Sequence, residues 1–139
     1  TVMCGGTTEA FETALPVLQT FGAKIVLLGA PGSAQQAKII NNSLLAATMG
    51  LAYSALNTAD EIGVDRAALI DLIQHSSGRS FGFDVVARLP TPEAFAHGAK
   101  MLFKDVQLLG SIRDPNAEPD ALTIAALPFL EATGTTKGD

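Results

Sequence analysis

The fold is decided by a glycine-rich turn and the helix start that follows it, GAPGSAQQAKIINN at residues 29–42. Residues 34–62 contain no proline and one glycine, Gly50, and they are followed by Gly63, where a left-handed glycine commonly ends a helix. At about 1.5 Å per residue, this predicted helix is roughly 43 Å long. Its apolar residues surround the whole circumference, so we expect it to run through the middle of a helical assembly.

Lys38 and Asn42 stand out against this apolar helix. They are four residues apart, so their side chains lie on the same face, one turn from each other. A cation and an amide placed in this way can hold one small polar ligand from the same side. The alternative is that both belong to the solvated side of the first turns, as polar residues in such positions usually do.

The string around these two residues resembles the segment that joins the two domains of the β-hydroxyacid dehydrogenases, the group of 3-hydroxyisobutyrate dehydrogenase and tartronate semialdehyde reductase. In that family a glycine-rich turn leads into a helix with Lys, two variable residues and Asn-Asn, matched here by Lys38, Asn41 and Asn42. Residues 1–6, TVMCGG, resemble the end of the nucleotide-binding domain. Residues 101–106, MLFKDV, resemble the family's Lys-Asp-Leu signature, so the resemblance covers nearly the whole chain.

The resemblance implies a role for each matched residue. Lys38 corresponds to the general acid of the reduction, which is the general base of the oxidation. Asn42 corresponds to the residue that holds the substrate's hydroxyl or carboxylate, and Asn41 is a second candidate that could equally pair with the neighbouring backbone. Lys104 corresponds to the lysine that reaches towards the nicotinamide ribose of the cofactor, NAD or NADP. Asp105, beside it, is expected to be structural.

The reaction class explains why a lysine suits this position. Hydride transfer between a nicotinamide and a carbonyl leaves an alkoxide charge, which a nearby proton donor must neutralise. A lysine can serve if burial or neighbouring charges lower its pKa from about 10.4 towards roughly 7–8. Lys38 enters an apolar helix at a predicted domain junction, and we expect such a lowering there.

Two positions depart from the family pattern. Ala34 stands where many relatives have a glycine. His97 stands eight residues before Asp105, where the family often carries an aromatic residue near the substrate. Residues 75–80, HSSGRS, resemble both the 3-hydroxyisobutyrate branch and a branch that acts on four-carbon sugar acids. The identity of the small hydroxyacid substrate therefore stays open.

Residues 1–28 are predicted to form a strand, a helix and a second, parallel strand, which is typical of the end of a Rossmann-type domain. Residues 1–4 and 24–28 are the strands, and the second, a continuous apolar run, is expected to be buried. The helix between them should begin after a threonine cap, and its apolar face should extend to Phe21. Three elements cannot form a stable sheet alone.

From residue 30 onwards the chain is predicted to be entirely helical. The overall prediction is a mostly α fold with two domains. Residues 1–29 are expected to be the remnant of an NAD(P)-binding Rossmann domain. Residues 30–139 are expected to form an all-α domain that resembles the C-terminal domain of 6-phosphogluconate dehydrogenase and serves substrate binding and dimerisation. Beyond the long helix, we expect helices at residues 66–75, 80–88, 98–112 (or from 91–93) and 120–133, caps at Asp65, Ser80 and Asp120, a loop at 114–119 and a frayed tail at 134–139.

Composition narrows the possible classes of protein. Hydrophobic residues make up 47% of the chain and charged residues 17%, with a mean hydropathy of +0.30, so we expect another domain or subunit to cover part of the surface, as in a homodimer or homotetramer. No apolar run reaches 18 residues without interruption, so no membrane span is expected. The net charge of −5 argues against a nucleic-acid partner.

Cysteine and histidine usage adds two expectations. Cys4 is the single cysteine, which rules out a disulfide within the chain and fits a cytoplasmic setting. Its thiol is expected to be buried in a strand. His75 and His97 have no carboxylate or cysteine at ligand spacing, so no metal site is expected.

The sequence carries no Gly-x-Gly-x-x-Gly fingerprint and begins directly on a β-type run. We therefore expect a C-terminal part of a longer enzyme, in which the other part binds most of the cofactor, and we expect the isolated 139-residue chain not to turn over substrate. The alternative is a non-catalytic helical module whose apolar surface serves only association. Imine reductases share the architecture but usually lack the lysine, so Lys38 disfavours them.

Overall fold

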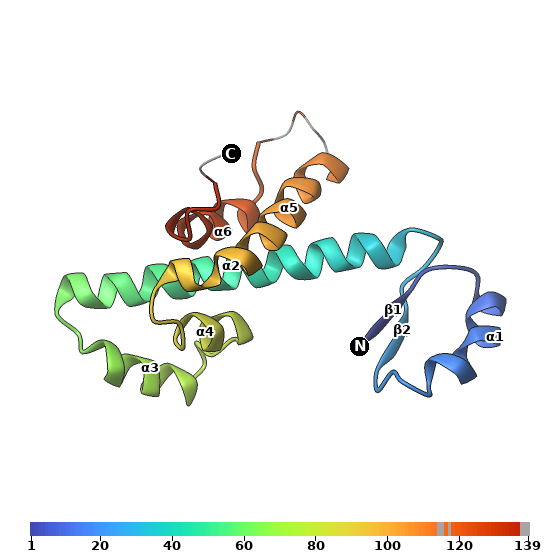
Figure 1. Ribbon diagram of the computed structural model, residues 1–139, viewed down its shortest axis with the longest axis horizontal. Helices are drawn as coiled ribbons and strands as arrows, with labels where there is room; N and C mark the ends of the chain where they lie inside the picture. The colour runs from blue at the N-terminus through green and yellow to red at the C-terminus, as the bar shows by residue number, and fades with distance from the viewer. Residues whose placement is uncertain (114–115, 117, 137–139) are drawn as a thin grey trace. The chain divides into compact units, whose positions relative to one another are not determined.

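The structure, a computed structural model, describes residues 1–113, 116 and 118–136 (Figure 1). The chain divides into two compact units, Thr1–Asn41 and Asn42–Asp139. The secondary structure is mostly helical with one short parallel sheet, as the sequence predicts. The predicted loop and tail lie partly outside the described residues, at 114, 115, 117 and 137–139.

The first unit begins with the predicted βαβ arrangement. It contains β1 (Val2–Cys4), α1 (Thr8–Leu18) and β2 (Ile25–Leu27). The two strands pair in parallel, with Val2 opposite Ile25 and Cys4 opposite Leu27. The Thr7 hydroxyl caps α1 by accepting a hydrogen bond from the N–H of Ala10 at 3.2 Å.

Two details of this unit differ from the prediction. The helix ends at Leu18, and Phe21, predicted to extend its apolar face, lies beyond it with 69% of its surface exposed. β2 is half-buried rather than buried. Both differences have the same cause, because two strands and one helix provide too little apolar surface to cover each other.

The long helix α2 (Ser33–Ile62) matches its prediction closely. It ends at Gly63, which has a left-handed φ of +77°, and the N–H of Val64 returns to the carbonyl of Ala59 at 2.9 Å. By length and composition alone α2 could also cross a membrane. In the structure, 44% of its most apolar 18-residue stretch is buried inside the protein, and a buried core helix passes the same test of length and composition.

The first turn of α2 packs against the end of β1. A Cβ atom on Gly5 would lie 2.9 Å from both the Ala30 carbonyl oxygen and the Ser33 hydroxyl. These contacts explain why the compact units divide after Asn41. The division into domains at residues 1–29 and 30–139 concerns which parts fold independently and stays a prediction.

The remaining helices begin close to the predicted residues. Asp65, Ser80 and Asp120 cap three of them, accepting hydrogen bonds of 2.7, 3.0 and 2.9 Å from the N–H groups three residues further on. The helix after Ser80 is shorter than predicted, and Pro92 starts a separate 3₁₀ turn. The elements are α3 (Arg66–Gln74), α4 (Phe81–Val86), η1 (Pro92–Phe95), α5 (Ala96–Arg113) and α6 (Ala121–Ala132).

The core of the second unit forms around α2. In Figure 1, α5 and α6 lie on one side of this helix and α3 and α4 on the other. Glycines permit the close approaches: Gly50 faces the Ala125 carbonyl of α6, and Gly82 of α4 faces the hydroxyl of Thr48. The buried apolar cluster includes Ala46, Met49, Ala52, Leu56, Phe83, Leu102, Val106, Ala126, Phe129 and Leu130.

A pair of glycine substitutions tests this packing. A methyl group at Gly50 would overlap the Ala125 carbonyl, so Gly50→Ala should force α2 and α6 apart and destabilise the fold by about 1–3 kcal/mol. Gly110 in α5 is the matched control, because nothing lies within 4 Å of its added Cβ. Gly110→Ala should stabilise the fold by up to about 1 kcal/mol. Chemical denaturation of both variants measures these changes, and equal effects would contradict the packing.

Asp120 gives a pH-dependent prediction. The Thr123 N–H, assisted by Arg113 at 3.2 Å, holds the pKa of Asp120 below its usual value. The charged form therefore stabilises the fold at pH values above the unfolded pKa of about 3.9, and this contribution disappears as the pH falls through the folded pKa.

Asp120→Asn keeps a capping oxygen but has no charge, whereas Asp120→Ala also loses the cap, at a cost of about 1 kcal/mol. The stability difference between wild type and Asp120→Asn should be largest near neutral pH and should shrink towards zero in acid. Denaturation curves across this pH range measure it. A difference that stays constant throughout would contradict the role of the charge.

Candidate functional site

The predicted catalytic and substrate-binding residues lie on α2. Lys38 is exposed, and the half-buried Asn42 follows one turn later on the same face. Asn41 is exposed and points about 100° away from Asn42 around the helix. This chain therefore does not bury the Lys38 side chain. Any desolvation of its ammonium group must come from what covers this part of α2.

Asn42 contacts a residue far away in the sequence. Its Nδ2 donates a hydrogen bond of 2.6 Å to the Oδ2 of Asp105, which is 63 residues further along the chain. Asp105 lies in α5 and is only 7% exposed, among buried apolar neighbours such as Leu102 and Val106. This bond joins the Lys-x-x-Asn-Asn segment to the Lys-Asp pair.

Lys104, the predicted cofactor-binding residue, precedes Asp105 on α5. Successive helical residues point about 100° apart, and Asp105 faces inward while Lys104 is exposed. His97 and Met101 precede Lys104 at intervals of four and three residues, so these three exposed side chains share one face of α5. This face presents the ammonium group of Lys104 and the imidazole of His97.

The other sequence candidates lie apart from this arrangement. His75 is exposed at the end of α3, with its Nδ1 2.8 Å from the Asp71 carbonyl oxygen. Cys4 is half-buried in β1 rather than fully buried. Neither residue has a place in the candidate site.

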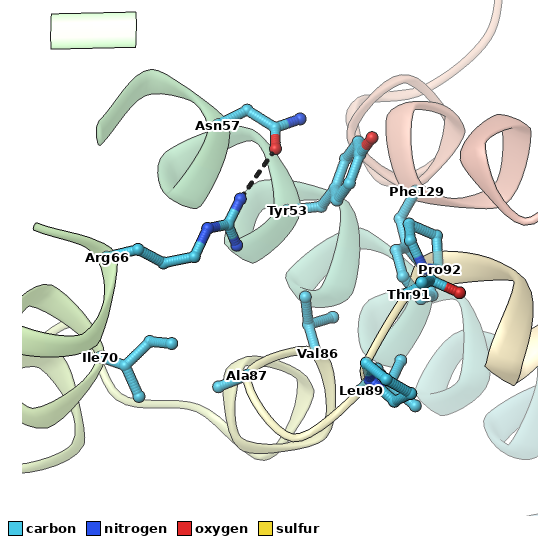
Figure 2. A pocket seen from close by; sticks show the side chains of 11 residues that line it. Tyr53, Asn57, Arg66, Ile70, Val86, Ala87, Leu89, Thr91, Pro92 and Phe129 are labelled. Atoms are coloured by element: carbon cyan, nitrogen blue, oxygen red, sulfur yellow. Dashed lines mark hydrogen bonds between the residues drawn. The ribbon is translucent and has the colours of Figure 1, made fainter. Parts of the chain in front are cut away.

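A separate hollow of about 330 Å³ lies near the other end of α2 (Figure 2). Tyr53 and Asn57 of α2 line it together with Arg66 of α3 and the apolar side chains of Leu89 and Phe129. Figure 2 shows the Arg66 guanidinium directed at Asn57, and Nη2 donates to the Asn57 Oδ1 at 3.2 Å.

This hollow is distinct from the site around Asn42. Asn57 lies 15 residues further along α2, which corresponds to about 22 Å. Arg66 is also paired with Asp60, whose Oδ2 lies 2.7 Å from its Nη2, so the positive charge of the hollow is already compensated. Sequence reasoning missed the hollow because its lining comes from four separate segments and contains no recognisable spacing.

Comparison with known proteins identifies the family of this chain. The family model described as "NAD-binding of NADP-dependent 3-hydroxyisobutyrate dehydrogenase" matches residues 32–125, more than half of the chain. The mitochondrial 3-hydroxyisobutyrate dehydrogenase of Pongo abelii is 34% identical over 117 residues, covering 78% of this chain and 35% of that protein. The enzyme of the same name from Bos taurus is 38% identical over 90 residues, covering 65% of this chain and 27% of that protein.

Solved structures show the same fold. The Mycobacterium tuberculosis 3-hydroxyisobutyrate dehydrogenase determined with L-serine has a TM-score of 0.71 and 24% identity, over 96% of this chain and 54% of that chain. A 3-hydroxyisobutyrate dehydrogenase from Salmonella typhimurium has a TM-score of 0.72 and 20% identity, over 96% of this chain and 48% of that chain.

The matching family model describes the NAD-binding part of NADP-dependent dehydrogenases. More narrowly, the chain belongs to the 3-hydroxyisobutyrate dehydrogenase family, which confirms the resemblance found in the sequence and the expected cofactor class, NAD or NADP. The chain spans about a third of the length of the curated relatives it matches.

Proposed function

We propose that this chain is the helical, substrate-binding part of an NAD(P)-dependent oxidoreductase that interconverts a small β-hydroxyacid with its semialdehyde or keto acid. The observation that carries the proposal is the 2.6 Å hydrogen bond between Asn42 and Asp105. It joins the two segments that carry the proton donor and the cofactor contact expected from the family resemblance, Lys38 and Lys104. The 3-hydroxyisobutyrate dehydrogenase relatives support the reaction class.

The residues of this chain fit the nicotinamide end of the cofactor. Lys104 offers an exposed ammonium group, a donor for ribose hydroxyls. In the first unit, β1 and β2 pair in parallel, and Gly5 follows the carboxyl end of β1, the edge at which parallel sheets bind dinucleotides. When bound, the nicotinamide exchanges a hydride with the substrate carbon.

Lys38 and Asn42 handle the substrate oxygen in this proposal. In reduction, the Lys38 ammonium gives a proton to the oxygen as it gains negative charge, and in oxidation the neutral amine takes that proton back. Asn42, one turn along the same helix, holds the hydroxyl or carboxylate, with Asn41 as a secondary contact. Cover of this face by substrate and cofactor would remove water from around the Lys38 ammonium group.

Exposed apolar side chains favour a second role in association. Leu51, Ile62 and Phe81 are 60%, 71% and 73% exposed, which is unusual for such large side chains on an uncovered surface. We therefore propose a homo-oligomer, a dimer or tetramer, assembled through the helical part. We also propose that the protein is cytoplasmic. A four-carbon sugar acid is the alternative substrate.

Substitution of Lys38 tests the catalytic assignment in the protein expressed from the gene's full reading frame. Lys38→Ala should lower kcat by about 10²–10⁴-fold because the alkoxide loses its proton donor. Lys38→Arg should be nearly as slow, since a guanidinium keeps its proton. Oxidation rates of 3-hydroxyisobutyrate, glycerate and threonate with NAD and NADP measure this effect, and cofactor titration should give an unchanged Kd.

Gln36→Ala is the matched control for this experiment. Gln36 is exposed on α2 but two residues from Lys38, so it points to nearly the opposite side of the helix. Its substitution should leave turnover unchanged. Wild-type turnover by Lys38→Ala would reject Lys38 as the proton donor.

A further inference from the structure

The carboxylate of Asp105 is an unusual feature of the helix that carries it. The neighbouring inward positions of α5 are apolar, with Leu102, Val106 and Leu109 each no more than 6% exposed. Removing a carboxylate from water is costly unless hydrogen bonds replace the lost hydration. Its bond to the Asn42 amide is short, 2.6 Å, as expected when the acceptor is charged.

This contact determines which way the Asn42 amide faces. The oxygen and nitrogen ends of an asparagine amide have nearly the same shape, so packing alone does not select between the two flipped orientations. A carboxylate only accepts hydrogen bonds, so it selects the orientation in which Nδ2 faces Asp105. The direction of Oδ1 is then fixed on the other side of the amide.

We infer that Asp105 is a positioning residue, which acts on the substrate through Asn42 by holding the amide in one orientation. The inference rests on the proposed function, in which Asn42 holds the substrate. A hydroxyl can donate a hydrogen bond to an oxygen of fixed direction, and the substrate oxygen is thereby presented to Lys38, one helical turn away. Misplacement of a reacting group by about 1 Å can cost about 100-fold in rate, which is the scale on which such positioning acts.

The direct test is Asp105→Asn in the full-length protein. The substituted side chain has nearly the same shape, but its amide can accept or donate, so Asn42 is free to flip. We expect kcat/KM for the hydroxyacid to fall by about 10–100-fold. The cofactor Kd and the shape of the unfolding transition should stay close to those of the wild type.

A double-mutant cycle separates positioning from an independent effect. Because Asp105 acts through Asn42, adding Asp105→Asn to Asn42→Ala should lower kcat/KM by no more than about twofold further. The matched control is Asp84→Asn: Asp84 is a largely buried carboxylate in α4 that pairs with Arg79 at 3.1 Å. This control should leave kcat/KM unchanged.

The possible results distinguish the inference from the function on which it rests. If Asn42→Ala alone leaves kcat/KM unchanged, the proposed substrate contact is wrong and the inference fails with it. Two results would overturn only the inference, provided that Asn42→Ala lowers kcat/KM. In the first, Asp105→Asn leaves kcat/KM unchanged, like the Asp84 control. In the second, Asp105→Asn lowers kcat/KM by the same factor with and without Asn42.

A measurement on the wild-type protein covers the case in which Asp105→Asn does not fold. The Nδ2 protons of Asn42 should exchange slowly with solvent when the hydroxyacid is bound, because the bond to Asp105 persists in the complex. Rapid solvent exchange of these protons in the complex would overturn the inference.

Discussion

The hydrogen bond between Asn42 and Asp105 is the interaction on which the candidate site depends. It connects two segments separated by 63 residues, which carry Lys38, the expected proton donor, and Lys104, the expected cofactor contact. Without this contact, the start of α2 and the middle of α5 would be two unrelated polar stretches. With it, an amide in the first half of a long helix is held by a carboxylate whose own surroundings are apolar.

Helix packing brings these two residues into contact. α2 forms the centre of the second unit, and Gly50 and Gly82 allow neighbouring helices to approach it more closely than any side chain would permit. At one end of the second unit this packing places Asp105 beside Asn42. At the other it leaves the hollow lined by Tyr53 and Arg66, in which the charge is already paired (Figure 2).

The sequence predicted those features that depend on local chemistry. The caps at Asp65, Ser80 and Asp120 and the left-handed Gly63 follow from which residues satisfy helix ends, and each is confirmed. The family was recognisable because Lys38, Asn41 and Asn42 stand at fixed spacing. The partner of Asn42 was not predictable, because pairing across 63 residues depends on how α5 packs and no local rule encodes it.

The errors have a similar physical origin. β2 and Phe21 look like core elements in the sequence, but burial depends on partners elsewhere, and two strands with one helix do not provide them. Lys38 is exposed on this chain, and its expected desolvation at a domain junction stays a prediction. A residue type and its spacing indicate what a side chain can do, whereas its environment depends on the surfaces that meet there.

The most direct test of this account is a crystal structure of the full-length protein with a nicotinamide cofactor and a β-hydroxyacid. We expect the Lys38 Nζ within hydrogen-bonding distance, about 3 Å, of the substrate oxygen. We expect Asn42 to contact the same molecule while still bonded to Asp105, and Lys104 to lie beside the nicotinamide ribose. A substrate bound elsewhere, with the Lys38 ammonium in bulk solvent and Asn42 turned away from Asp105, would contradict the account.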